Sequence, residues 1–230
     1  MKFAPIIVSA GILLFCTSCF AGVPEASQNR TNPTNPTISK HEYHVTRALE
    51  KYHSGDFQGS IVEWNKVIEI YPKDAIAFYS RGLVKSSLGD YQGAIIDHTE
   101  AIRILPKYDD AFYNRGLVKF KLGDYYSAIV DASEAVKINP NYSDAYSIRG
   151  VAKLKLGDPR SALNDFNTSI RINPNDVSTY YNRGHAKGML GDKKGALQDL
   201  KKSSQLSKDE GNLEEYQRIL KVIEKVEKSR

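Results

Sequence analysis

The sequence predicts an all-α protein, built as a solenoid of five helix–turn–helix repeats with one further helix at its C-terminus. Two observations lead to this prediction. A Gly-Asp pair recurs every 34 residues, and four prolines keep the same step. A fixed period of this length indicates one supersecondary unit copied along the chain, with each copy packed on its neighbours. The pairs begin at Gly55, Gly89, Gly123, Gly157 and Gly191, and the prolines are Pro72, Pro106, Pro140 and Pro174.

Each copy divides at its Gly-Asp pair into two amphipathic halves. Apolar residues before Gly89, such as Phe78 and Leu83, recur at helical spacing, and so do those after it. Glycine can adopt the left-handed conformation that ends a helix, aspartate suits the N-cap of the next helix, and proline ends the second helix. The copies align without gaps over residues 41–74, 75–108, 109–142, 143–176 and 177–210.

Two columns of small residues predict close packing between the two helices of a copy. Glycine inside a helix costs about 0.5–1 kcal/mol relative to alanine, so a close approach of two helices must offset it. An aromatic column lies one turn before the glycines, on the same face. His98 shares a second-helix column with Trp64 and Phe166 and is expected in the core. The small columns are Ala48, Gly82, Gly116, Gly150 and Gly184, and Ser60, Ala94, Ala128, Ala162 and Ala196; the aromatic column is Phe78, Phe112, Tyr146 and Tyr180.

These columns, together with the Asn-Arg-Gly and Leu-Gly-Asp runs, resemble the tetratricopeptide repeat (TPR) of bacterial proteins over residues 41–210. The resemblance implies a right-handed solenoid that binds other proteins on a concave face lined by the first helix of each repeat. Two departures stand out. His44 occupies the aromatic column of the first copy, and Lys208 replaces the proline of the fifth. Terminal repeats are often atypical because they face solvent or a cap.

Nine residues map onto the peptide-binding groove that the resemblance implies. Tyrosines at repeating steps, with leucine beside them, suit a short extended or helical peptide. The alternative, that these aromatic side chains pack between adjacent repeats, remains open. The predicted groove residues are Tyr79, Leu83, Tyr113, Leu117, Phe120, Lys121, Lys155, Tyr181 and His185.

Three columns of charged residues also recur with the 34-residue period. Arginines and acids that recur in every copy are expected to form partly buried ion pairs; the alternative is a basic ladder for an acidic ligand. The lysines, one turn after the arginines, are expected to extend their ammonium groups into solvent. The arginines are Arg47, Arg81, Arg115, Arg149 and Arg183, the acids are Glu63, Asp97, Asp131, Asp165 and Asp199, and the lysines are Lys51, Lys85, Lys119, Lys153 and Lys187.

The N-terminal region has the pattern of a secretory signal peptide over residues 1–21. Lys2 precedes an apolar run, and small residues precede a cleavage site after Ala21. This predicts a periplasmic or secreted protein, with a lipid anchor at Cys19 as the alternative. The apolar run is shorter than the roughly 18–20 residues that cross a membrane, so no span is expected in the mature chain. Residues 22–39 are rich in Pro, Thr and Asn and are expected to form a flexible linker.

The C-terminal residues 211–230 are expected to form a capping helix over the last repeat. One face of this segment is apolar, and charges of both signs lie opposite it. This pattern is typical of an amphipathic helix that covers the end of a solenoid. The apolar stripe consists of Leu213, Tyr216, Ile219, Leu220, Ile223 and Val226.

The remaining features favour protein binding without catalysis. The net charge is only +5, lysines and acids alternate, and no aromatic–basic pattern for nucleic acid occurs. His41 and His44 lack the spacing of four that brings two metal ligands together on a helix, so neither a metal nor a cofactor is expected. The predicted function is an exported interaction scaffold or adaptor that binds peptide segments of partner proteins. The alternative is an assembly factor or chaperone-like protein for an envelope or photosynthetic complex.

Overall fold

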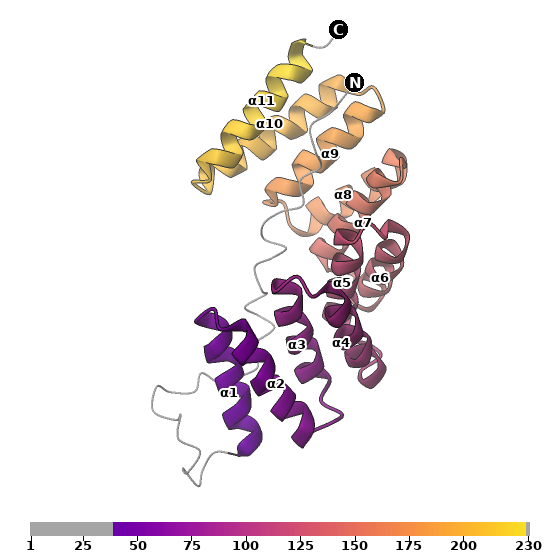
Figure 1. Cartoon of the computed structure of the whole chain (residues 1–230). Coiled ribbons are helices and arrows are strands. Elements are labelled where there is room, and N and C mark those ends of the chain that lie inside the picture. Colours follow the sequence, from indigo (N-terminus) through magenta and orange to yellow (C-terminus); the bar gives the residue numbers. More distant parts are fainter. Residues whose placement is uncertain (1–38, 229–230) are drawn as a thin grey trace. The chain divides into compact units, whose positions relative to one another are not determined.

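The computed structural model describes residues 39–228, so the predicted signal peptide and all but the last residue of the predicted linker lie outside the described residues. Within this range the chain forms eleven helices and no strand (Figure 1). The helices are α1 (Lys40–His53), α2 (Phe57–Ile70), α3 (Ala75–Ser87), α4 (Tyr91–Ile104), α5 (Asp109–Lys121), α6 (Tyr125–Ile138), α7 (Ser143–Lys155), α8 (Pro159–Ile172), α9 (Val177–Met189), α10 (Lys193–Asp209) and α11 (Leu213–Lys228).

The described chain divides into two compact units. The first contains α1–α5 and ends at Asp124, and the second contains α6–α11 and begins at Tyr125. In the first unit each helix packs on the next, from α1 to α5. In the second unit the same sequential packing runs from α6 to α11. Because neighbouring helices pack in order, the prediction of an all-α repeat solenoid is confirmed.

Glycine and aspartate form the turn between the two helices of a copy, as predicted. Gly89 has a φ of +82°, a left-handed conformation that glycine adopts without strain. The Asp90 carboxylate then accepts a 2.9 Å hydrogen bond from the Gly93 amide at the start of α4. Such an N-cap stabilises a helix by about 1 kcal/mol. The same geometry recurs at Gly55 and Asp56, at Gly157 and Asp158, and at Gly191 and Asp192.

Proline sets the length of the second helices. Four of them end two residues before a proline of the column: α2, α4, α6 and α8. In the fifth copy Lys208 replaces this proline, and α10 continues to Asp209. The longer helix follows because lysine retains the amide hydrogen and lacks the ring that would break the helical ladder.

The small columns mark close approaches between the two helices of a copy. A Cβ atom added at Gly150 would lie 2.7 Å from a ring carbon of Phe166, and one added at Gly82 would lie 2.8 Å from the ring of His98. His98 and Phe166 are both fully buried. The prediction that His98 belongs to the core is therefore confirmed, and glycine is required where a larger side chain would overlap a core ring.

The arginine and acid columns form buried ion pairs. In the second copy Arg81 donates two hydrogen bonds to the Asp97 carboxylate, at 2.9 and 2.6 Å. Lys85 binds the same carboxylate at 2.8 Å, so the expectation that the lysine heads extend into solvent was wrong. The buried carboxylate has two oxygens to satisfy, and the second cation completes its coordination. The same triads join Arg149, Lys153 and Asp165, and Arg183, Lys187 and Asp199.

The arginines of the second to fifth copies also link each copy to the preceding one. Arg81 donates through Nη1 to the side-chain oxygen of Asn65, at 2.7 Å, and its guanidinium lies 5.3 Å from the centre of the Phe78 ring. One planar cation thus binds an acid in its own copy and an amide in the previous one. The equivalent links between copies are Arg115 to Thr99, Arg149 to Ser133, and Arg183 to Asn167.

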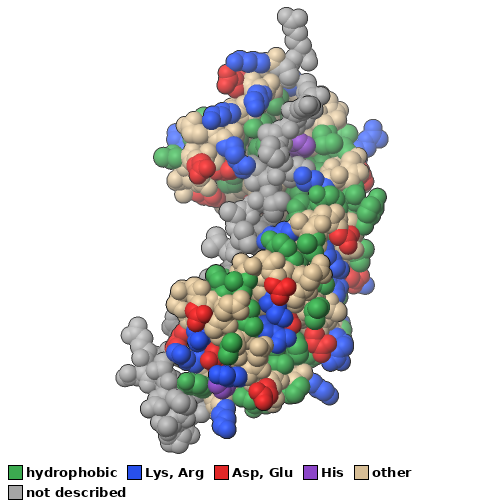
Figure 2. Space-filling model, in the orientation of Figure 1, with side chains coloured by type: hydrophobic (Ala, Val, Ile, Leu, Met, Phe, Trp, Pro, Cys, Tyr) green, Lys and Arg blue, Asp and Glu red, His purple; other side chains and the backbone are tan. Residues whose placement is uncertain are grey.

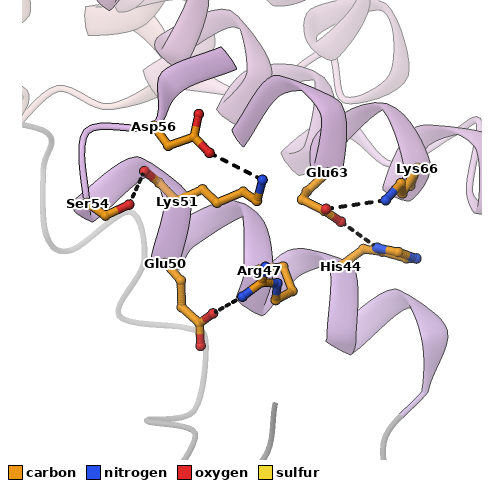
Figure 3. A network of polar contacts seen from close by, with 8 residues as sticks. All are labelled: His44, Arg47, Glu50, Lys51, Ser54, Asp56, Glu63 and Lys66. Carbon is orange, nitrogen blue, oxygen red and sulfur yellow. Dashed lines mark hydrogen bonds and ion pairs between the residues drawn. The ribbon is translucent and has the colours of Figure 1, made fainter. Parts of the chain in front are cut away.

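The first copy uses a different polar network (Figure 3). The Nδ1 atom of His44 lies 2.7 Å from a carboxylate oxygen of Glu63, and Lys66 lies 3.3 Å from the other oxygen. Arg47 instead pairs with Glu50 on the surface of α1, at 3.2 Å. The predicted pairing of arginine with the acid column therefore does not extend to this copy. Here His44 occupies the aromatic column and binds the acid, Glu63.

The last helix covers the end of the second unit. It packs on α10, and its apolar face joins one core cluster with residues of α9 and α10. Leu213 lies in the predicted stripe but is 64% exposed, whereas Val222 is buried although the stripe omitted it. The cluster contains Tyr181, Leu200, Ile219, Val222, Ile223 and Val226.

Candidate functional site

All nine predicted groove residues lie on the first helices of their copies. In the first unit, α3 and α5 are in contact, and in the second unit α7 and α9 are in contact. The predicted residues therefore lie on neighbouring helices within each unit. Those of the first unit are Tyr79, Leu83, Tyr113, Leu117, Phe120 and Lys121, and those of the second are Lys155, Tyr181 and His185.

The aromatic and aliphatic members of this set are buried. The Tyr79 ring lies 4.9 Å from that of Tyr108 and 5.5 Å from that of His98, measured between centroids. Its hydroxyl accepts a 3.1 Å hydrogen bond from the side-chain amide of Asn114, on the first helix of the next copy. These contacts correspond to the packing alternative raised by the sequence. The other buried members are Leu83, Tyr113, Leu117, Phe120 and Tyr181.

The accessible members of the set are basic. Lys155, at the end of α7, is exposed, while Lys121 and His185 are half-buried. The Lys121 ammonium lies 5.5 Å from the centre of the Tyr91 ring, and burial lowers the pKa of this lysine. Burial also lowers the pKa of His185, and the charge of Lys155 lowers it further. Both effects disfavour the protonated, cationic form of His185.

A carboxylate that the sequence reasoning missed lies at the opposite end of α7. Asp144 occupies the first turn of this helix, and Lys155 its last residue. The two are eleven residues apart, which places them on one face and about 16 Å apart along the axis. Desolvation raises the pKa of the Asp144 carboxyl, and repulsion from Asp176 raises it further. The sequence did contain a signal for this carboxylate, because Asp110 occupies the equivalent position one repeat earlier.

Charges of both signs are otherwise interspersed. Lys and Arg side chains alternate with Asp and Glu over the visible face of each unit (Figure 2). Within residues 39–228, no group of three or more His, Cys, Asp or Glu side chains could hold a metal ion. His41 binds Asp74 at 3.2 Å, and His44 binds Glu63. In the same range, no helix combines the length and the apolar character needed to cross a bilayer.

Family models described as tetratricopeptide repeats match residues 109–142 and 143–176, which are the third and fourth copies with the boundaries predicted above. No curated protein sequence matches the chain. Solved structures do resemble it. The MamA fragment "41-end" from Desulfovibrio magneticus RS-1 is 19% identical, with 75% of this chain and 97% of that chain covered and a TM-score of 0.69.

Two further solved structures share the fold. YrrB, described as a TPR protein with an unusual peptide-binding site, is 23% identical, with 73% of this chain and 86% of that chain covered and a TM-score of 0.61. PilF of Pseudomonas aeruginosa is 18% identical, with 80% of this chain and 88% of that chain covered and a TM-score of 0.66. This fold supports a protein–protein interaction scaffold, of a kind that is generally non-catalytic. The repeat sequences and the fold agree, and the chain is a tetratricopeptide repeat protein.

Proposed function

We propose that this protein is an exported, non-catalytic scaffold that binds peptide segments of partner proteins along its first helices. The observation that supports the proposal most is the charge pattern of α7, with a carboxylate at Asp144 and a cation at Lys155 on one face. Helix α5 repeats the pattern with Asp110 and Lys121. Opposite charges at the two ends of a helix face favour one orientation of a bound segment.

Recognition would rest on the accessible polar side chains more than on the buried tyrosines. In the first unit Lys121 supplies donors for carboxylates and backbone carbonyls of a peptide, and in the second unit Lys155 and His185 do so. The buried rings hold the helices that carry these groups in fixed positions. The peptide-binding site named for YrrB adds support, because that protein shares the fold. Export is inferred from the signal-peptide pattern of residues 1–21.

Cross-linking followed by mass spectrometry of the captured proteins tests the binding function. The full chain is compared with a variant that combines Lys121→Ala, Lys155→Ala and His185→Ala. Lys221→Ala serves as a matched control, because Lys221 is an exposed lysine on α11. Partners captured by the parent and the control, and lost by the triple variant, would support the proposal. Equal capture by all three proteins would contradict it.

Export is tested separately by the mass of the protein recovered from outside the cytoplasm. Cleavage after Ala21 gives a chain that begins at Gly22. Recovery of the uncleaved chain in the cytoplasm would contradict export and leave the binding result unaffected.

A further inference from the structure

We propose a second protein-binding site at the edge of the first unit, an apolar pocket that takes bulky apolar side chains from an acidic peptide segment. The pocket has a volume of about 780 Å³. It is lined by His41 of α1, by the C-terminal ends of α2 and α4 at Ile70, Tyr71, Ile104 and Leu105, and by Ile76 of α3. A volume of this size lies within the range of about 300–1,000 Å³ that is typical of ligand pockets.

The pocket walls are large apolar side chains that remain open to solvent. Tyr71 is 52% exposed, Ile76 57% and Leu105 45%. Scattered apolar residues are normal on a protein surface, but several gathered around one hollow indicate an interaction site. None of the predicted groove residues lines this pocket, and neither Asp110 nor Asp144 does, although Ile76 is their equivalent on α3.

The repeat itself shows that the fold does not require apolar residues here. Leu105 follows α4, and its equivalent in the fourth copy is Asn173, which follows α8. The two backbones have nearly the same conformation, with φ and ψ of −122° and 90° at Leu105 and −124° and 94° at Asn173. The third copy has Asn139 at this position, and the equivalents of Ile76 are Asp110 and Asp144. Polar residues thus suit the same positions in later copies.

Lysines accompany the apolar residues in the same two copies. Lys73 lines the pocket, and Lys107 occupies the equivalent position after α4. Both are exposed, and their equivalents in the later copies are Asn141 and Asn175. Ile70 and Ile104 keep isoleucine in the later copies, as Ile138 and Ile172, but the exposed wall residues Tyr71, Leu105 and Ile76 and the two lysines occur together and are replaced together. Charge complementarity then selects a partner segment that carries carboxylates beside its apolar side chains.

The concave shape favours a peptide over a membrane surface. Side chains that insert into a bilayer must protrude from the protein, whereas Ile76 and Leu105 form the walls of a hollow. A hollow of this kind suits a projecting side chain such as Phe or Leu, which fills the space and is desolvated there. Asp74 also lines the pocket, but it binds His41 and caps α3 through the amides of Ile76 and Ala77.

Fluorescence anisotropy with a synthetic peptide tests this site. The probe is a short fluorescein-labelled peptide in which Phe and Leu are interspersed with Glu, and a second peptide has Lys in place of each Glu. The full chain is compared with Leu105→Asn and Ile76→Asp, which introduce residues that later copies carry at these positions. Val130→Asn is the matched control, since Val130 is 61% exposed outside the pocket and its equivalent is Asn164.

The acidic peptide is expected to bind the parent and Val130→Asn equally. Binding should weaken about tenfold in Leu105→Asn and in Ile76→Asp, because each substitution removes an apolar side chain that contacts the peptide. Lys73→Asn with Lys107→Asn should weaken binding and reduce its salt dependence. Far-UV circular dichroism verifies that every variant is folded.

Four outcomes would overturn the proposal. The first is the absence of saturable binding of the acidic peptide, and the second is binding of the lysine peptide that is as tight as that of the acidic one. The third is an affinity of Leu105→Asn for the acidic peptide equal to that of the parent. The fourth is loss of peptide binding only in the variant that combines Lys121→Ala, Lys155→Ala and His185→Ala. The last result would move the peptide to the first-helix face and leave the proposed scaffold function standing. Co-sedimentation with phosphatidylglycerol vesicles that is lost in Leu105→Asn, without peptide binding, would assign the pocket to lipid instead.

Discussion

His44 holds the buried acid of the first copy, with its Nδ1 atom 2.7 Å from a carboxylate oxygen of Glu63. In the second copy the corresponding acid, Asp97, is bound by an arginine and a lysine, Arg81 and Lys85. Among the four copies with described pairs, the first copy is therefore the one whose buried acid has no arginine partner.

Acid should destabilise the first copy through Glu63. Burial disfavours its carboxylate, but hydrogen bonds from His44 and Lys66 outweigh burial and lower the pKa of Glu63. A carboxyl whose pKa is lower in the folded state stabilises the fold above its unfolded pKa of about 4.3, and this contribution is lost as pH falls through the folded pKa. The lone tryptophan, Trp64, is buried in this copy, so its fluorescence reports the transition.

The matched variant for this titration is Glu63→Gln. It lacks the carboxyl, so the part of the fluorescence transition that follows its protonation should disappear. An acid titration of Trp64 emission that is identical in parent and variant would show that Glu63 does not contribute.

Replacing Gly150 by leucine should strongly destabilise the fourth copy. Even a Cβ atom at this position would lie 2.7 Å from the buried ring of Phe166. Overpacking of a core typically costs about 1–3 kcal/mol, and here the helices must also move apart. Thermal denaturation should show a clear fall in Tm relative to Arg160→Leu, an exposed control on α8. Equal melting of the two variants would mean that the glycine column does not set the helix spacing.

Removing the acid of a buried triad should cost far more than removing one from the surface. Asp199 is buried between Arg183 and Lys187, both bound at 2.7 Å. Asp199→Ala leaves two partly buried cations without their counter-charge, a loss of about 3–5 kcal/mol. Glu224→Ala removes the partner of Lys228 on the surface of α11 and should leave stability nearly unchanged. Urea denaturation of both variants measures the difference, and similar midpoints would contradict a structural role for the triads.

The last helix should be part of the cooperative fold. Ile219 is fully buried against residues of α9 and α10. Ile219→Ala should destabilise the protein by about 2–5 kcal/mol, the usual range for a buried isoleucine. Leu213→Ala, at an exposed residue of the same helix, is the control. If Ile219→Ala unfolds like the control in urea, α11 does not stabilise the solenoid.

The sequence predicts those features of the fold that depend on local spacing. Gly89, Asp90 and Pro106 act through the backbone of a few neighbouring residues, so their columns reveal turns and helix ends. The pairing of Arg81 with Asp97 also follows from two columns that keep step. The coordination of Asp97 by Lys85 was missed, because it depends on how two helices approach and on the second oxygen of a buried carboxylate.

The candidate site was harder to predict than the fold. Tyrosine suits both a wet groove and a packed interface, and only the contacts of Tyr79 with Tyr108 and Asn114 decide between these roles. The apolar pocket was visible in the sequence only as a difference between copies, with Leu105 in one and Asn139 in another. Differences between aligned repeats mark the proposed pocket, whereas the shared columns mainly report packing.

Hydrogen–deuterium exchange of the full chain, alone and with a partner captured by cross-linking, tests the central claim most directly. The account predicts slower exchange in peptides from the first helices α5, α7 and α9, around Lys121, Lys155 and His185. Protection confined to α11 or to the second helices, with the first helices unchanged, would contradict binding along the first-helix face.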